Sequence, residues 1–284
     1  MRIRESLGDR VFNAVNLILM GIVLLLVLYP LYYIVIASIS DPVLVNTGQV
    51  TLYPRGILLE GYRRVLQHDA LWLGYRNSIL YMTLGTAISL GLTIPAAYGL
   101  ANRDLVGRNA LMMVFTLTMM FNGGLIPTYL VVKSLRIPNT VWALVLPGAL
   151  SVFNLIVSRT YMQRSIPRDL VEAAMIDGAA TLRVFFRIVL PLSVPLIAVI
   201  ALYYGIARWN DYFTALIYVS KRPLVPLQVV LREILIQTDM AATADAGESM
   251  AEQAKLAEIM KYCVIIAASL PAMVAYPFVQ KYFV

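Results

Sequence analysis

Several apolar runs, each near 20 residues long, constrain this chain more than any other feature. A helix of about 20 residues crosses the roughly 30 Å of hydrocarbon in a bilayer. Of the 284 residues, 60% are hydrophobic and only 14% are charged, whereas a soluble domain carries about 25% charged residues. Alternating ten-residue segments are missing, so the spans are expected to be helices, which satisfy their own backbone hydrogen bonds in lipid.

Six membrane helices are predicted, in a single all-α transmembrane domain that covers residues 1–284. The predicted spans are Phe12–Ser38, Tyr75–Ala101, Ala110–Val132, Thr140–Arg159, Leu192–Val219 and Met260–Val279. Asn16, Asn77 and Asn154 interrupt the apolar pattern, as positions that face the interior of a helical bundle often do. The first apolar run is too long for a cleavable signal peptide, and it ends in bulky rather than small residues.

An even number of spans places both termini on the same side of the membrane. Lys and Arg are about equally numerous on the two sides, so the positive-inside rule alone does not settle the orientation. The short link 102–108 and the Arg-rich segment 159–187 favour cytoplasmic termini. Two long loops, about 39–74 and about 220–259, then lie on the extracytoplasmic side.

These two loops differ in composition. The loop 39–74 is rich in Pro and Gly and is expected to be irregular, with short turns. The loop 220–259 holds an amphipathic piece, Leu227–Ile236, and an Ala/Glu-rich run, 241–258. Long loops on one face suggest either the docking of a partner or plain connectors.

Ionisable residues give little sign of chemistry by the chain itself. The net charge of +7 is spread along the sequence, which favours anionic lipid headgroups or an anionic solute over nucleic acid. Cys263 and His68 are the only residues of their kinds, so neither a disulfide within the chain nor a metal cluster is expected. No phosphate-binding loop or nucleophile elbow occurs. We therefore expect no enzyme activity, bound cofactor or metal in this chain.

A polar, helix-prone segment at about 161–191 separates the fourth and fifth spans. Ser165 is suited to cap a helix and Pro167 to lie in its first turn. Gly178 is placed to end that helix in a left-handed conformation, and Thr181 can then cap a second helix. The surface that results is rich in alanine: Ala173, Ala174, Ala179 and Ala180. We predict two short helices joined at glycine that project from the membrane; the alternative is an amphipathic helix on the membrane surface.

The spacing in this segment resembles the cytoplasmic signature of permease subunits of ABC importers: Glu-Ala-Ala, three residues, Gly, nine residues, Ile, one residue, Leu-Pro. The matching residues are Glu172, Ala173, Ala174, Gly178, Ile188, Leu190 and Pro191. The resemblance implies a MetI-like permease fold whose coupling helix lies in a cleft of a cytoplasmic ATPase subunit. These seven residues and Asp177 are the predicted ATPase-coupling site. Glu172 would form an ion pair at that joint, and Gly178 would set the turn.

Other parts of the chain extend the resemblance. Asn77-Ser78, Asn139-Thr140 and Trp209-Asn210-Asp211 look like the sugar-importing branch. The run 121–129 is similar to permeases for oligosaccharides from complex polysaccharides, including the alginate importer. The implied partners are a second, homologous permease subunit, two subunits that bind ATP and Mg, and an extracytoplasmic solute-binding protein that contacts the loop 220–259. The implied location is the bacterial cytoplasmic membrane.

Polar residues in the middle of the fifth span are candidates for a translocation path, because such residues are costly in lipid and often functional. The candidates are Arg208, Trp209, Asn210, Asp211 and Tyr212, together with Asn122 in the third span. Aromatic faces beside hydrogen-bonding groups are suited to sugars, and Tyr203 and Tyr204 lie one to two turns earlier. The alternative is an internal Arg208–Asp211 pair at helical spacing that only packs the bundle.

The nature of the solute is less constrained. Arg208 and basic residues on the outer side favour an acidic saccharide, such as a uronate oligosaccharide, over a neutral one. A secondary transporter driven by ions would need buried carboxylates and an internal inverted repeat, and only Asp211 meets either requirement. An enzyme acting on lipid-linked sugar would need paired carboxylates near the membrane interface.

Overall fold

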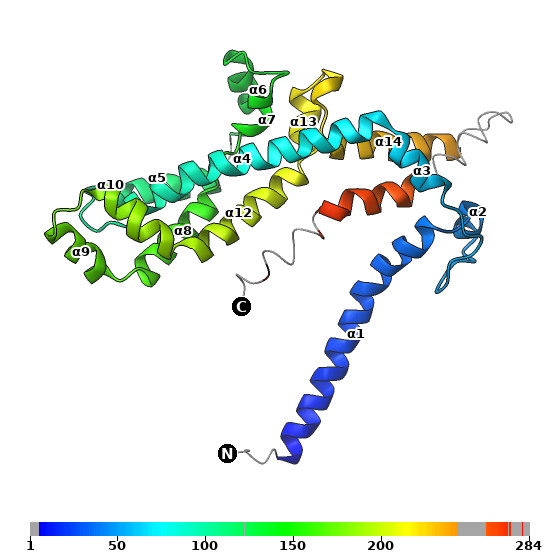
Figure 1. The fold of residues 1–284 in the computed structure, drawn as a ribbon, viewed down its shortest axis with the longest axis horizontal. Helices are drawn as coiled ribbons and strands as arrows, with labels where there is room; N and C mark the ends of the chain where they lie inside the picture. The colour runs from blue at the N-terminus through cyan, green and yellow to red at the C-terminus, as the bar shows by residue number, and fades with distance from the viewer. Residues whose placement is uncertain (1–5, 122, 244–259, 272, 274–279, 281–284) are drawn as a thin grey trace. The chain divides into compact units, whose positions relative to one another are not determined.

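The computed structural model describes residues 6–121, 123–243, 260–271, 273 and 280, and all regular elements in these residues are helical (Figure 1). The α-helices are α1 Leu7–Ser38, α2 Pro42–Asn46, α3 Glu60–Gln67, α4 Asp69–Ala101, α5 Arg108–Met120, α6 Leu125–Ser134, α7 Val141–Val145, α8 Val152–Ser165, α9 Arg168–Ile176, α10 Thr181–Val184, α11 Leu190–Leu192, α12 Val194–Trp209, α13 Phe213–Tyr218 and α14 Leu227–Thr243. A further apolar helix covers Met260–Pro271. The chain packs into two units, residues 1–69 with 231–270 and residues 70–230 with 271–284. The single-domain organisation therefore stays a prediction.

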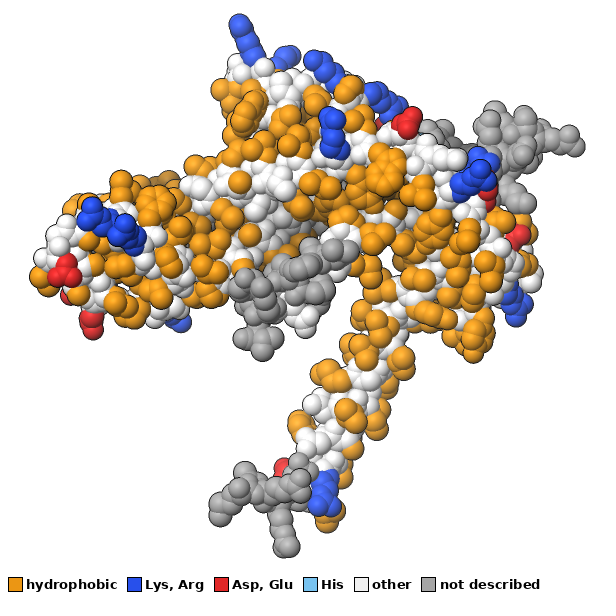
Figure 2. Space-filling model, viewed as in Figure 1, with side chains coloured by type: hydrophobic (Ala, Val, Ile, Leu, Met, Phe, Trp, Pro, Cys, Tyr) orange, Lys and Arg blue, Asp and Glu red, His pale blue; other side chains and the backbone are white. Residues whose placement is uncertain are grey.

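Helix α1 in the first unit contains the first predicted span and begins five residues before it. Ser6 starts the helix through a capping box: the Asp9 N–H donates to Ser6 Oγ over 3.2 Å, and the Ser6 N–H donates to Asp9 Oδ2 over 3.0 Å. Hydrophobic side chains line most of the face seen in Figure 2, with charged side chains near the N-terminal end, and only its last three residues are buried. Such a helix has no polar face for water, as expected of a membrane span.

The loop 39–74 is more regular than its composition predicted. It holds α2 and α3, and Asp41 organises its first part. The Asp41 carboxylate accepts the Val43 N–H over 2.9 Å at the start of α2, and the Asp41 N–H donates to the Arg55 carbonyl over 3.0 Å. Ser38 at the end of α1 shares a 2.8 Å hydrogen bond with Tyr62 in α3. Backbone pairing and capping thus make this loop a folded part of the unit.

Helix α4 is the central element of the second unit and contains the second predicted span. Among its buried residues, beside larger ones such as Tyr81 and Ile94, are many with small side chains: Gly74, Ser78, Gly85, Ser89, Thr93 and Ala97. Small residues let helix backbones approach closely in a membrane bundle. Thr93 shares a 2.7 Å hydrogen bond with Tyr204 of α12, and Arg159 of α8 donates to the Leu100 carbonyl over 3.0 Å. These contacts hold α8 and α12 beside α4 (Figure 1).

The fourth predicted span is wrong as a continuous helix. It consists of α7 and α8, separated by residues 146–151. Pro147 and Gly148 lie in this break, and Gly148 has φ = +69°. Proline has no backbone N–H to donate to a helical hydrogen bond, and a residue in the left-handed conformation does not continue a helix.

The third and fifth predicted spans are also interrupted. The third is divided into α5, which ends at Met120, and α6, which begins at Leu125, and Gly124 has φ = +86°. In the fifth, helical structure begins already at Thr181 and passes through a π-helical turn at Phe185–Val189. It then bends by 78° between Leu192 and Val194, breaks after Trp209 and resumes as α13 at Phe213. Prolines 191 and 195 flank the bend, which is a common cause of kinks.

By length and composition, the described residues contain two helices able to cross a membrane, α1 and α4, or up to four spans if each bent helix pair counts as one. Of the sixth predicted span, Met260–Pro271 is helical, and most of the remainder lies outside the described residues. The predicted all-α fold class is therefore confirmed for the described residues, whereas the number of six spans stays a prediction.

Candidate functional site

Many of the site residues predicted from the sequence lie at two places in the second unit. The first is the Gly178 knuckle, which we define as residues 168–184, comprising α9, the turn at Gly178 and α10. Gly178 has φ = +81°. Its N–H donates to the Met175 carbonyl and the Ala179 N–H to the Ala174 carbonyl, each over 3.0 Å. This pair of bonds is a Schellman motif, so the predicted left-handed stop and the two helices joined at glycine are confirmed.

The predicted helix caps of this segment are wrong. Ser165 is the last residue of α8, and Pro167 occupies the N-cap position of α9 instead of its first turn. The reason is the proline: the residue before it, Ile166, is held extended with φ = −98° and ψ = 114°. Thr181 is the first residue of α10, and the Ala180 carbonyl accepts the Arg183 and Val184 N–H groups there.

The signature residues divide between two sides of the knuckle and the helix that follows it. Ala174, Ile188 and Leu190 pack against the core cluster of the unit. The exposed members are Glu172, Ala173, Asp177, Gly178 and Pro191. Glu172 forms an ion pair with Arg168 one turn earlier, and the two side chains are 46% and 55% exposed. The signature thus supplies both a buried anchor and an outward surface.

Apolar side chains also point outward from the knuckle. Ile176 is 86% exposed and Leu182 is 72% exposed, and Leu170 and Met175 are about half exposed. Exposed apolar residues in an otherwise polar segment indicate a contact surface. A partner that covers them would bury the side of the knuckle that carries Ala173 and Asp177.

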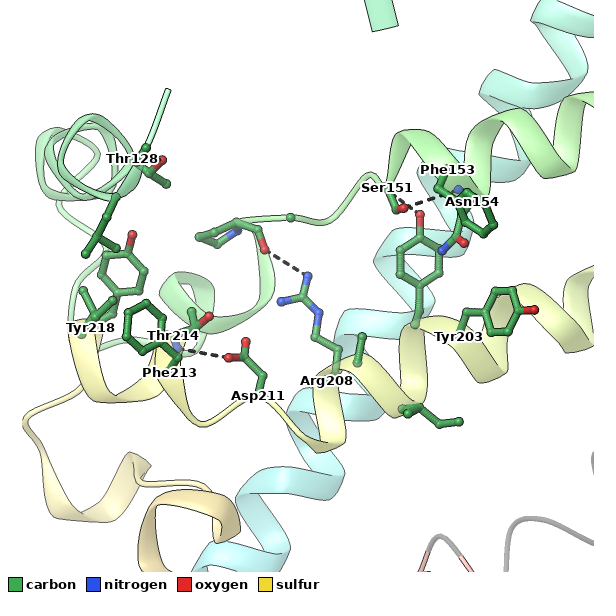
Figure 3. A pocket seen from close by; sticks show the side chains of 18 residues that line it. Thr128, Ser151, Phe153, Asn154, Tyr203, Arg208, Asp211, Phe213, Thr214 and Tyr218 are labelled. Carbon is green, nitrogen blue, oxygen red and sulfur yellow. Dashed lines mark hydrogen bonds between the residues drawn. The ribbon is translucent and has the colours of Figure 1, made fainter. Parts of the chain in front are cut away.

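The second place is a cavity of about 900 Å³. Figure 3 shows Ser151, Phe153, Asn154 and Tyr203 at one end, and Thr128, Phe213, Thr214 and Tyr218 at the other. Arg208 and Asp211 lie between the two ends. The chain breaks described above form much of its wall, because Gly124, Pro147 and Gly148 all line it.

Arg208 is bound to the break between α7 and α8. Its Nη1 donates to the Leu144 carbonyl over 2.7 Å, and its Nη2 donates to the Val145 and Pro147 carbonyls over 2.9 and 3.1 Å. The last carbonyls of a helix have no partner within it, and here the guanidinium supplies one. Gly85 of α4 makes room for this side chain, since a Cβ at that position would lie 3.2 Å from Arg208 Nε.

Asp211 has a similar role at the next break. Its Oδ1 accepts the Thr214 N–H over 3.1 Å at the start of α13. The internal Arg208–Asp211 ion pair that the sequence left open is therefore not formed among the described residues. Both side chains form hydrogen bonds with backbone groups at the ends of helices, and both line the cavity.

The remaining predicted path residues are placed elsewhere. Trp209 is buried, with its ring centroid 6.2 Å from that of Tyr75. The Asn210 amide donates to the Ile206 carbonyl over 3.0 Å, and Tyr212 packs edge-on against Phe213. None of these three residues lines the described cavity. Asn122 lies outside the described residues.

Sequence reasoning did not assign Ser151, Phe153 or Asn154 to the cavity. A signal for Asn154 existed, because it interrupts an apolar run. The Tyr204 hydroxyl holds this end together: it accepts the Ser151 N–H over 3.0 Å and bonds Thr93 Oγ1 over 2.7 Å. A local pattern could not show that α8 and α12 face each other here.

The start of the loop 220–259 is fixed by polar side chains of the same unit. Asn139 Oδ1 accepts the Ser220 N–H over 2.6 Å, and Asn77 Nδ2 donates to the carbonyls of Pro223 and Val225 over 2.8 and 3.0 Å. The amphipathic piece Leu227–Ile236 is helical and lies within α14. Most of the Ala/Glu-rich run lies outside the described residues. Asn77 thus serves to position this loop.

Comparison with known proteins identifies the family. The model of the family described as "Binding-protein-dependent transport system inner membrane component" matches residues 69–284. The chain is 40% identical to Protein LplC of Bacillus subtilis over 97% of this chain and 92% of the relative. It is 39% identical to the polygalacturonan/rhamnogalacturonan transport system permease protein YtcP of the same organism, over 91% and 90%.

A solved structure is also similar, that of a bacterial ABC transporter involved in the import of the acidic polysaccharide alginate. The TM-score is 0.89 at 34% identity, and the match covers 99% of this chain and 100% of the other. The predicted resemblance to ABC sugar-importer permeases with a MetI-like fold is confirmed. The chain belongs to the family of inner membrane components of binding-protein-dependent transport systems.

Proposed function

We propose that this chain is one of two membrane-spanning subunits of an ATP-driven importer and forms part of the path for an oligosaccharide. The single observation that carries the proposal is the Gly178 knuckle. It combines a fixed backbone turn, an anchored inner side and exposed apolar side chains. A rigid element of this kind can transmit the motion of a partner, whereas a flexible loop would absorb that motion.

The energy source follows from what the sequence lacks. It contains no phosphate-binding loop, so ATP and Mg would be bound by two separate ATPase subunits. Their contact surface would be the exposed side of the knuckle, with Glu172 and Asp177 at its polar edge. The knuckle would then be cytoplasmic, in the bacterial inner membrane. With six spans, both termini would be cytoplasmic too.

A binding protein on the opposite side would deliver the solute. The start of the loop 220–259, fixed by Asn77 and Asn139, is suited to receive it. We infer an oligosaccharide as the solute because a relative is named for the transport of polygalacturonan and rhamnogalacturonan. The similar structure belongs to an alginate importer, which favours an acidic cargo; a neutral oligosaccharide is the alternative.

Reconstitution tests the proposal. The chain would be purified with a homologous permease, ATPase subunits and a binding protein, and placed in proteoliposomes. ATP hydrolysis is expected to rise when the binding protein and an oligogalacturonide are added together, with uptake of the sugar. Uptake by this chain alone, driven by an ion gradient, would contradict the proposal.

Crosslinking tests the knuckle directly, with neighbouring alanines as a matched pair. Ala173 is exposed, whereas Ala174 packs against the core. A cysteine in place of Ala173, or of Asp177, is expected to crosslink to an ATPase subunit in native membranes. Replacement of Ala174 should give much less product. Equal crosslinking at both alanines, or none at Ala173 and Asp177, would count against this contact.

A further inference from the structure

One polar side chain of the cavity has no partner. Asn154, in the first turn of α8, is only 5% exposed and lines the cavity. Its backbone N–H donates to Ser151 Oγ over 3.4 Å. Its side-chain amide forms no hydrogen bond among the described residues and is not one of their fully buried unpaired groups, so it is open to the cavity. An amide of this kind can donate one hydrogen bond and accept another from a ligand in the cavity.

Aromatic surfaces lie beside this amide. Phe153 is 53% exposed and Tyr203 is 43% exposed, and Figure 3 places both at the same end of the cavity as Asn154. Ligand sites commonly combine apolar and aromatic walls with a few polar groups that fix orientation. A sugar ring presents apolar C–H faces and hydroxyl edges, which match the rings and the amide respectively.

The charged groups of the cavity argue against recognition of a carboxylate there. The Arg208 guanidinium donates to three backbone carbonyls. A carboxylate that bound Arg208 would be limited to the N–H groups that these carbonyls leave free and would approach Asp211, which also lines the cavity. Asn154 lies at the end of the cavity away from this pair (Figure 3).

We propose that Asn154, Phe153 and Tyr203 form a subsite for one sugar ring of the transported oligosaccharide, recognised through its hydroxyls and ring face and not through a carboxylate. This inference rests on the proposed function and deepens it. It implies that selection for an acidic cargo takes place in the binding protein, while this cavity accepts rings irrespective of their charge.

The test uses the reconstituted importer with its binding protein. Asn154→Ala is expected to lower uptake of an oligogalacturonide by about three- to tenfold, the range for losing one or two neutral hydrogen bonds. The loss should be the same for a partly methyl-esterified oligogalacturonide, because the subsite reads no carboxylate. Gln163→Ala is the control, since it removes an exposed amide from the same helix outside the cavity wall; its uptake should stay within about twofold of wild type.

Folding and coupling are checked in the same vesicles. Assembly of the Asn154→Ala importer and its ATP hydrolysis stimulated by the binding protein should stay near wild type, which separates lost recognition from lost structure. If the variant does not assemble, Asn154→Ser, which keeps a smaller polar group, replaces it. Wild-type uptake by the Asn154 variant, or a loss confined to the more acidic sugar, would overturn the subsite. Absence of uptake and stimulation in the wild-type importer would instead overturn the proposed function.

Discussion

The Gly178 knuckle and the cavity lined by Arg208 and Asp211 belong to the same unit but are stabilised differently. The knuckle is local: its turn is closed by hydrogen bonds between residues three to five apart, from Gly178 to Met175 and from Ala179 to Ala174. The cavity is assembled from distant segments, since Arg208 bonds carbonyls more than 60 residues away. The comparison teaches that a turn closed by local hydrogen bonds can be encoded in a short stretch of sequence. A cavity between helices depends on contacts between distant segments, which stabilise the helix ends that line it.

The largest expected effect concerns the cavity. Arg208→Ala removes the donor to three carbonyls, and we expect the free energy of unfolding to fall by about 2–4 kcal/mol, because each unpaired buried group costs about 1–3 kcal/mol and water in the cavity recovers part of it. Thermal unfolding of the purified importer measures this. Arg63→Ala, at an exposed arginine, should change the value by less than about 0.5 kcal/mol. Equal stability of both variants would show that the long-range contacts do not hold the cavity.

A smaller effect is expected in the knuckle. Gly178→Ala places a Cβ on a residue with φ = +81°, at a cost of about 1–2 kcal/mol. No atom lies within 4 Å of that Cβ, so the cost comes from the backbone alone. Hydrogen exchange of the Gly178 and Ala179 amides should quicken, and ATP hydrolysis stimulated by the binding protein should fall. Gly91→Ala is the control, because its Cβ is equally free and lies in a regular helix. An equal effect of the two variants would contradict a left-handed requirement.

A third test probes the end of the cavity at which Ser151 lies. Tyr204→Phe leaves the Ser151 N–H and the Thr93 hydroxyl without their shared partner, and we expect a loss of about 1–2 kcal/mol in the free energy of unfolding. Chemical denaturation of the purified importer would measure it. Tyr53→Phe removes a hydroxyl from a side chain that is 74% exposed and should be nearly neutral. Similar values for both would mean that the Tyr204 hydroxyl does not stabilise this wall.

The smallest expected change in stability concerns the Arg168–Glu172 ion pair. Both side chains are about half exposed, and exposed pairs contribute about 0.2–1 kcal/mol. Arg168→Gln should therefore barely alter unfolding. If Glu172 pairs with an ATPase subunit, Glu172→Gln should lower stimulated ATP hydrolysis more than Arg168→Gln does. Equal activities of the two variants would indicate that the intramolecular pair is the only one that matters.

The extent of prediction from sequence differs along the chain for physical reasons. The spans Phe12–Ser38 and Tyr75–Ala101 were predictable because an apolar run long enough to cross the hydrocarbon favours one continuous helix in lipid, even with Pro30 and Pro95 inside it. The fourth span was not, since Pro147 and Gly148 interrupt a run of suitable length. Periodicity does not reveal whether such residues bend a helix or end it. Arg208 decides this by supplying hydrogen-bond donors to the carbonyls that the break leaves free.

Within the site, whether the role of a residue could be predicted from the sequence depended on how far away in the chain its partners lie. Gly178 was predictable, since a left-handed glycine after a helix needs only its neighbours. The role of Arg208 was not, because a charge in an apolar run suggests a ligand or an ion pair equally well, whereas its actual partners are backbone carbonyls. Asn154 was noticed as a bundle-facing residue, but its free amide becomes evident only once the surrounding helices are placed.

The sequence by itself determined the membrane character, the family signature and the turn of the knuckle, because these depend on hydrophobic length and on spacing within one or two helical turns. Only the tertiary structure decided which helices are broken, which side chains hold the breaks, and which polar group remains free for a ligand. Those outcomes depend on hydrogen bonds between segments far apart in the chain, whose pairing is fixed only when the helices pack together.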